Sequence, residues 1–193
     1  MTEPALFSVV QLGEFPTTRE LGRIGRGRLE DLVADGRHLD LTIDFSGVTA
    51  MTISFADEFL GRFLASFDGA ASDTTLKVAG LNDDNRYAVV VCVERRRTHV
   101  VVLEQDGSLN LVGDDPIVAA TFDVARGLGK FRANDVAALL AVSAPNANNR
   151  LKRLTEIGAV RKSRSASPIR GGKEFTYRCV TAQVLDGEVL TSA

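Results

Sequence analysis

Residues 44–61, with the sequence DFSGVTAMTISFADEFLG, decide how the first half of the chain folds. Residues 39–45 alternate in hydrophobicity and are β-prone, which predicts a buried strand. After Ser54 the period changes, because phenylalanine recurs every four residues and places an apolar stripe along a helix. These phenylalanines are Phe55, Phe59, Phe63 and Phe67. The stretch therefore predicts a strand, a tight loop and a capped helix.

Ser54 lies where the period changes, and we expect it to be the N-cap of this helix. A serine hydroxyl at an N-cap accepts a hydrogen bond from the free N–H groups of the first turn. Asp57 follows three residues later, where its carboxylate can complete a capping box. In this structural role the Ser54 side chain would contribute about 1 kcal/mol to stability.

The order of these segments is similar to the centre of a STAS domain, the fold of the anti-sigma factor antagonists. The similarity rests on a strand that ends in Asp44-Phe45-Ser46-Gly47-Val48 and on a serine that opens the next helix. The form Ser54-Phe55-Ala56-Asp57-Glu58-Phe59 more closely resembles the STAS-like domains to which no function is assigned. The resemblance covers roughly residues 5–100, and it implies a mixed sheet with helices packed against it.

The resemblance also bears on the role of Ser54. In the antagonists, the serine at this position is phosphorylated by a kinase-like ATP-binding partner. Those proteins usually have Asp-Ser-Ser-Gly there, whereas this chain has Thr52-Ile53-Ser54-Phe55. A phosphate on Ser54 would be favoured by the helix N-terminus but repelled by Asp57 and Glu58. This acidic pair could instead form the edge of a surface for a protein partner.

Charge is distributed unevenly along the 193 residues, although the net charge is only −2. Residues 1–116 have 11 Lys and Arg against 19 Asp and Glu, whereas residues 117–182 have 12 against 4. Such a split predicts two domains with different partners, of which the second favours an anionic partner. We expect a STAS-like domain at residues 1–114, a second domain at 115–182 and a tail at 183–193.

The first domain alternates strands with helices, which predicts an α/β sandwich. We expect strands at residues 5–12, 38–45, 75–80, 100–103 and 109–112, and helices from the segment 16–18 to about 35, at 54–67 and at 83–97. Residues 69–74 are small and polar, so we expect a loop there. The glycines at 22–27 match neither a dinucleotide fingerprint nor a P-loop, which favours a glycine-weakened helix over a phosphate loop. Arg95, Arg96 and Arg97 are expected to form a solvated helix end.

From residue 117 onward the pattern is that of three helices and a hairpin. Helices are expected at 117–127, 134–142 and 146–157, and strands at 159–163 and 174–180 enclose a basic tip. This order predicts a winged helix-turn-helix. The stretches 131–137, 143–154 and 157–160 resemble helix two, the recognition helix and the start of the wing of winged-helix transcription factors. The expected fold class is therefore α/β (α+β), with a STAS-like mixed sheet followed by a winged helix.

The predicted recognition helix has one apolar face and one amide-rich, basic face. At 100° per residue, Ala147, Leu151 and Leu154 point inward. The outward face suits base edges and phosphates, because Asn pairs with adenine and Arg with guanine. The wing would add contacts to the backbone or the minor groove. The candidate DNA-binding residues are Asn146, Asn149, Lys152, Arg153, Arg164, Arg170 and Lys173.

Catalytic, metal and membrane functions find little support in the sequence. We see no nucleophile, base and orienting group together, so we expect no enzyme. His38 and His99 lack neighbours at metal-ligand spacing, and we expect neither a metal nor another cofactor. Cys92 and Cys179 lie in apolar runs typical of core residues in a reducing cytoplasm. The first residues lack the basic-then-apolar pattern of a signal peptide, and no apolar run approaches the roughly 20 residues that span a bilayer, so we expect neither a signal peptide nor a membrane span.

These observations predict a cytoplasmic bacterial regulator. Its STAS-like domain would relay a signal through a protein partner, and its winged helix would bind double-stranded DNA. One short recognition helix buries too little surface for tight binding, so we expect a homodimer. The alternative is a non-enzymatic interaction adaptor, for example in a stress or defence module, whose winged helix docks protein rather than DNA.

Overall fold

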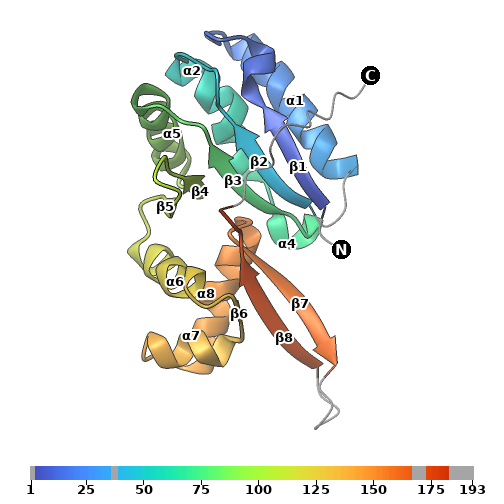
Figure 1. The fold of residues 1–193 in the computed structure, drawn as a ribbon, viewed down its shortest axis with the longest axis vertical. Helices are drawn as coiled ribbons and strands as arrows, with labels where there is room; N and C mark the ends of the chain where they lie inside the picture. Colours follow the sequence, from blue (N-terminus) through green and yellow to red (C-terminus); the bar gives the residue numbers. More distant parts are fainter. Residues whose placement is uncertain (1–2, 36–38, 167–172, 183–193) are drawn as a thin grey trace.

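The computed structural model describes residues 3–35, 39–166 and 173–182. It has a mixed α/β fold with one five-stranded sheet and one three-stranded sheet, each with its own helices (Figure 1). Three of the predicted features lie outside the described residues: His38, Arg170 and the segment 183–193.

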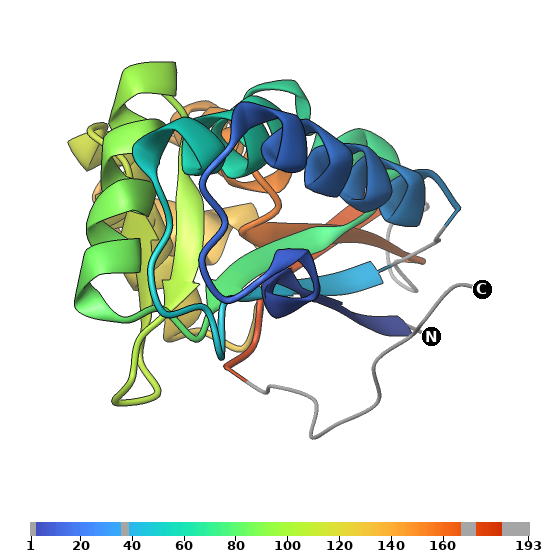
Figure 2. The ribbon, with the colours of Figure 1, turned by 90° about the horizontal axis from the view of Figure 1, so that it is seen from above.

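The larger sheet has four parallel strands and one antiparallel edge strand. They are β1 (Glu3–Ser8), β2 (Leu39–Asp44), β3 (Thr75–Ala79), β4 (Val100–Leu103) and the antiparallel β5 (Leu109–Val112). Their order in space is the order in sequence. Right-handed crossovers that always step in one direction place the connecting helices on one face. Figure 2 shows these helices together on one side of β1 and β2.

The connecting helices fill the three crossovers. They are α1 (Arg19–Asp35), the run of α2 (Ile53–Ala56), η2 (Asp57–Gly61) and α3 (Arg62–Ser66), the short α4 (Gly69–Ser72), and α5 (Asp83–Arg96). Segment η2 is π-helical, so the predicted helix from Ser54 to Phe67 contains one wider turn. The strand, helix and hairpin order predicted for residues 38–112 is confirmed.

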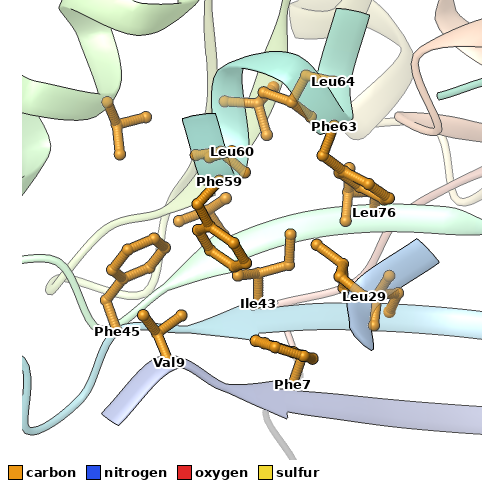
Figure 3. Packing of buried hydrophobic residues seen from close by; sticks show 14 of the residues in the cluster. Phe7, Val9, Leu29, Ile43, Phe45, Phe59, Leu60, Phe63, Leu64 and Leu76 are labelled. Carbon is orange, nitrogen blue, oxygen red and sulfur yellow. The ribbon is translucent and has the colours of Figure 1, made fainter. Parts of the chain in front are cut away.

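Phe59 lies at the centre of the first hydrophobic core (Figure 3). Its ring centroid lies 5.7 Å from that of Phe7 on β1, 6.3 Å from that of Phe45 after β2, and 5.5 Å from that of Phe55. Aromatic side chains bury large apolar areas and favour such tilted and offset contacts. The apolar stripe predicted after Ser54 is therefore the contact between this helix and the sheet.

The glycine-rich stretch of α1 is a helix, as predicted, and its glycines permit close packing on η2. A Cβ atom on Gly22 would lie 3.0 Å from the carbonyl oxygen of Phe55, and one on Gly25 would lie 2.4 Å from Leu12 Cδ1. Gly27 faces open space, because a Cβ there would meet no atom within 4 Å. Two of the three glycines thus serve helix packing rather than phosphate binding.

The second half of the chain forms a smaller unit with its own core. It comprises α6 (Pro116–Arg126), β6 (Lys130–Phe131), α7 (Ala133–Leu139), α8 (Ala144–Glu156), β7 (Val160–Ala166) and β8 (Lys173–Cys179). The three strands are antiparallel in the order β6-β8-β7. Phe122, Leu151 and Tyr177 belong to its core cluster, which also contains Val101 of β4.

Backbone contacts join the two units. The Leu76 N–H donates to the Gly158 carbonyl at 2.9 Å. A Cβ on Gly69 of α4 would lie only 2.7 Å from Gly158 Cα at the end of α8. Arg161 of β7 donates to the carbonyl of Asp73 at 3.0 Å and lies within ion-pair distance of the Asp40 carboxylate. The division of the chain at residue 114 stays a prediction, and the units on its two sides share this junction.

Three local details differ from the sequence predictions. The first strand ends at Ser8, and Val9–Leu12 forms the 3-10 helix η1 that turns Val9 and Leu12 into the core. The loop expected at 69–74 contains α4, which is capped by the Asp68 carboxylate accepting from the N–H groups of Ala70 and Ala71. Strand β6 was not predicted, since two residues carry no readable alternation.

Substitutions of two helical glycines test the junction. We expect Gly69→Ala to lower the free energy of unfolding by about 1–3 kcal/mol, because the methyl group would overlap the backbone of Gly158. Gly27→Ala is the matched control and should raise it by about 0.5–1 kcal/mol, because alanine is the better helix former. Urea denaturation of both variants measures these changes. Equal stability of Gly69→Ala and the parent chain would contradict the close contact.

Candidate functional site

The helix that follows β2 is capped by Thr52, not by Ser54. The Thr52 hydroxyl oxygen accepts from the Phe55 N–H at 3.1 Å, and the hydroxyl donates to the Thr17 carbonyl at 2.6 Å. Threonine is also a good N-cap, and the backbone hydrogen bond from Thr52 N–H to the Pro16 carbonyl fixes it there. The cap predicted at Ser54 is therefore wrong by two residues.

Ser54 lies in the first turn of this helix, with its side chain exposed. Within the described part of the chain its hydroxyl has no hydrogen-bond partner, so it has no structural role there. The free N–H groups of a first helical turn attract anions. The position thus combines accessibility with a favourable field for a negative group.

Asp57 forms a two-pronged ion pair with Arg96 of α5. Arg96 Nε lies 2.9 Å from Oδ1 and Nη2 lies 2.7 Å from Oδ2. The hydrogen bonds from Arg96 lower the pKa of Asp57, against the opposing effect of burial. The interpretation of Arg96 as part of a solvated helix end is wrong, because its guanidinium fastens α5 to η2.

Glu58 is buried between two arginines. Only 7% of it is exposed. Its carboxylate lies 2.9 Å from Arg62 Nε and 3.4 Å from Arg26 Nη2 of α1. Consecutive carboxylates on the wide π-helical turn therefore face different helices, Asp57 toward α5 and Glu58 toward α1. The structure places them in ion pairs rather than on a free acidic edge, and three guanidinium groups offset the repulsion expected for a phosphate on Ser54.

Helix α8 buries the face that was predicted to point inward and exposes the amide-bearing face that was predicted to point outward. Ala147, Leu151 and Leu154 are fully buried, which confirms the inward face. Asn146 and Asn149 are exposed. The Asn146 side-chain oxygen accepts from Arg150 Nε at 2.6 Å. The amide-rich surface is therefore the N-terminal half of α8.

The two basic residues of α8 differ in their surroundings. Lys152 is exposed, and its ammonium lies 3.6 Å from Glu156, one turn later. Arg153 Nη1 lies 2.8 Å from the carboxylate of Asp115, the N-cap of α6. The Arg153 side chain is 51% exposed, and this surface ion pair turns its guanidinium toward α6. Sequence spacing alone did not show this, because the partner lies on another helix.

The hairpin of β7 and β8 carries two of the remaining candidates, Arg164 and Lys173. Lys162 Nζ lies 3.9 Å from the centroid of the Phe175 ring, and the Arg164 guanidinium lies 5.9 Å from it. Lys173 begins β8 opposite Ala166. The structure thus places Lys162 beside Arg164 on an exposed cationic surface. Lys162 was not among the candidates selected from the sequence.

A cavity of about 200 Å³ lies at the junction of the two units. Asp40 and Thr75 line it from the larger sheet, and Arg161, Thr176 and Arg178 line it from the smaller one. The sequence carries no signal for this site, because its residues come from strands far apart in the chain. The guanidinium groups of Arg161 and Arg178 and the carboxylate of Asp40 all line the cavity, so its lining is polar and of mixed charge.

The described residues show no group of three or more His, Cys, Asp and Glu that could hold a metal ion. Burial raises the pKa of both Cys92 and Cys179 to about 12, so the thiols stay protonated. Burial lowers the pKa of His99, which packs under Gly113 at the junction. No helix in the described ranges is both long and apolar enough to cross a bilayer.

A pair of alanine substitutions separates the cap from the exposed serine. Thr52→Ala should lower the free energy of unfolding by about 1 kcal/mol, because it removes the N-cap hydrogen bond. Ser54→Ala should change it by less than about 0.5 kcal/mol, as expected for an exposed side chain without partners. Chemical denaturation of both variants under the same conditions checks the assignment. The reverse order of effects would restore Ser54 as the cap.

Comparison with known proteins agrees with the resemblance of the first unit. A family model described as a STAS-like domain of unknown function (DUF4325) matches residues 27–86, from within α1 to the first turns of α5. No curated protein matches the chain. The matched range contains the central strands β2 and β3, the capped helix, and Asp57 and Glu58 with the Glu58 partner Arg62, whereas Arg26 and Arg96 lie outside it. Residues 27–86 therefore belong to a STAS-like domain.

Proposed function

We propose that the chain is a DNA-binding regulator whose second unit is a winged helix-turn-helix. The observation that carries the proposal is the order of elements, helix, strand, helix, helix and then two strands, around one core. Helix α8 would be the recognition helix, and the hairpin of β7 and β8 would be the wing.

Charge and exposure support duplex DNA as the ligand. Residues 117–182 have 12 Lys and Arg against 4 Asp and Glu. Asn146, Asn149 and Lys152 of α8 are exposed, as is Arg164 of the hairpin. Amide side chains suit the edge of adenine, and cations suit phosphates. Arg153 is left out of this surface, because Asp115 holds it.

The STAS-like domain would receive the signal in this proposal. Ser54 is its exposed serine, and a kinase-like ATP-binding protein is the partner that the resemblance implies. The junction at Gly69 and Gly158 would transmit a change from α4 to the end of α8. Binding as a homodimer in the bacterial cytoplasm completes the proposal, since one recognition helix gives little interface area.

An interaction adaptor is the second candidate, and one observation favours it. Leu139 is 61% exposed at the turn between α7 and α8. The neighbouring Ala138, Ala144 and Pro145 are exposed as well. An apolar surface beside the recognition helix suits a protein partner better than a phosphate backbone. In this alternative the second unit would dock protein rather than DNA.

Charge reversal separates the two candidates. We expect Lys152→Glu with Arg164→Glu to weaken retention of genomic duplex fragments at least tenfold at low salt, and to reduce the salt dependence by about one counterion per lost phosphate contact. Arg23→Glu with Arg28→Glu changes the net charge equally on exposed positions of α1 and should leave retention nearly unchanged. Binding isotherms at several salt concentrations provide the measurement. Equal losses in both variants, or no retention by the parent chain, would favour the adaptor.

Phosphorylation of Ser54 is a separate expectation. We expect part of the protein isolated from its native host to carry one phosphoryl group, which Ser54→Ala removes and Ser46→Ala retains. The helix N-terminus favours the phosphate, and Arg26, Arg62 and Arg96 offset the charges of the nearby carboxylates. Intact-mass analysis under several growth conditions is the test. An unmodified population under all of them would contradict a switch at Ser54.

A further inference from the structure

One face of the three-stranded sheet carries three cations in a single row. Lys130 of β6 lies opposite Arg178 of β8, which in turn lies opposite Arg161 of β7. Two residues away along the hairpin, Ser163 lies opposite Thr176, so this pair of hydroxyls points to the same face. All five side chains line the junction cavity between the two units.

Only part of the positive charge in this row is compensated. Like charges that lie opposite one another on neighbouring strands destabilise a sheet. Arg161 is balanced, because its guanidinium lies 3.4 Å from the carboxylate of Asp40 and 3.3 Å from that of Asp73. Lys130 and Arg178 are exposed, and neither forms an ion pair with another described residue. The row therefore keeps two positive charges without an acidic neighbour in the described part of the chain.

The larger sheet bounds the cavity on the side that faces the row. Asp40 of β2 and Thr75 at the start of β3 line it there, and its volume is about 200 Å³. The Asp40 carboxylate is already engaged, because it pairs with Arg161 and accepts a hydrogen bond from the Thr75 hydroxyl. Among the described residues that line the cavity, no carboxylate remains for Lys130 and Arg178.

We propose that this cavity binds a small phosphate monoester between the two units. Its charge of about −1.5 to −2 near pH 7 matches the two positive charges that the row leaves uncompensated. The fork of the Arg178 guanidinium suits phosphoryl oxygens, and Lys130 and the two hydroxyls add further donors. Pockets for drug-sized ligands measure about 300–1,000 Å³, so this smaller cavity suits a phosphoryl group on a short carbon skeleton.

The proposed site is separate from the surface assigned to DNA. Lys162 and Arg164 alternate along β7 with Arg161 and Ser163, so they point to the opposite face of the hairpin. The phosphate monoester site therefore does not depend on DNA binding. A ligand in the cavity would touch strands of both units and would stabilise the junction that joins them.

Thermal unfolding of the full chain tests for the ligand, because a compound that binds only the folded state raises the unfolding midpoint. The probes are glycerol 2-phosphate, succinate as a dianion without a phosphoryl group, and sodium chloride at matched ionic strength. We expect glycerol 2-phosphate to raise the midpoint by several degrees above the chloride value, and succinate to raise it less. Equal midpoints in glycerol 2-phosphate and chloride would overturn the proposal, as would equal effects of glycerol 2-phosphate and succinate.

Single substitutions locate the site. We expect Arg178→Gln and Lys130→Gln each to weaken binding of glycerol 2-phosphate at least tenfold in calorimetric titrations. Each should also raise the unfolding midpoint of the ligand-free chain, because a like charge leaves the row. Lys162→Gln removes an exposed charge from the other face of the hairpin and should leave the affinity unchanged.

Equal loss of affinity in Lys162→Gln and Arg178→Gln would overturn the proposal, because it would show a nonspecific effect of net charge. Unchanged affinity in both cavity variants would overturn it as well. Retention of duplex DNA by Arg178→Gln is measured in parallel and should stay close to that of the parent chain. The DNA-binding proposal and the phosphate monoester proposal can therefore fail independently.

Discussion

The larger sheet winds in a single direction, and this constraint governs the rest of the molecule. Four parallel strands follow one another in space as they do in sequence. Right-handed crossovers then bring α1, the helix after β2 and α5 to the same face. Among the described residues, none of these helices covers the opposite face, so the apolar side chains there pack against something else. The second unit supplies part of this packing, at Val101 and Leu111.

On the helical face, packing and charge reinforce each other. Phe59 brings the helix after β2 onto the strands, and Gly22 lets α1 approach it at backbone distance. The ion pairs of Asp57 with Arg96 and of Glu58 with Arg26 then fasten this helix to both of its neighbours. Partly buried pairs of this kind fix geometry more than they add stability. Ser54 is therefore displayed at the start of a helix that is held on three sides.

The junction attaches the second unit directly to the larger sheet and its helices. Gly158 ends α8 and meets both Gly69 and the N–H group of Leu76. Arg161 forms further ion pairs with Asp40 of β2 and with Asp73 at the end of α4. The C-terminal end of α8 is thus fixed by the first unit, whereas its amide-bearing N-terminal half stays open. A regulator of the proposed kind would have its relay at one end of this helix and its ligand surface at the other.

The sequence by itself determined the elements, because the period of apolar residues is local: the central strand, the phenylalanine stripe, the hairpin and the inward face of α8 all follow from it. It also determined the STAS-like region. Only the tertiary structure decided which polar residues meet. Arg96 with Asp57, Arg153 with Asp115 and Arg161 with Asp40 are pairs between distant segments. Thr52 displaced Ser54 as the cap because a loop far away in sequence holds it. Periodicity reports which face is buried, but not which neighbour buries it.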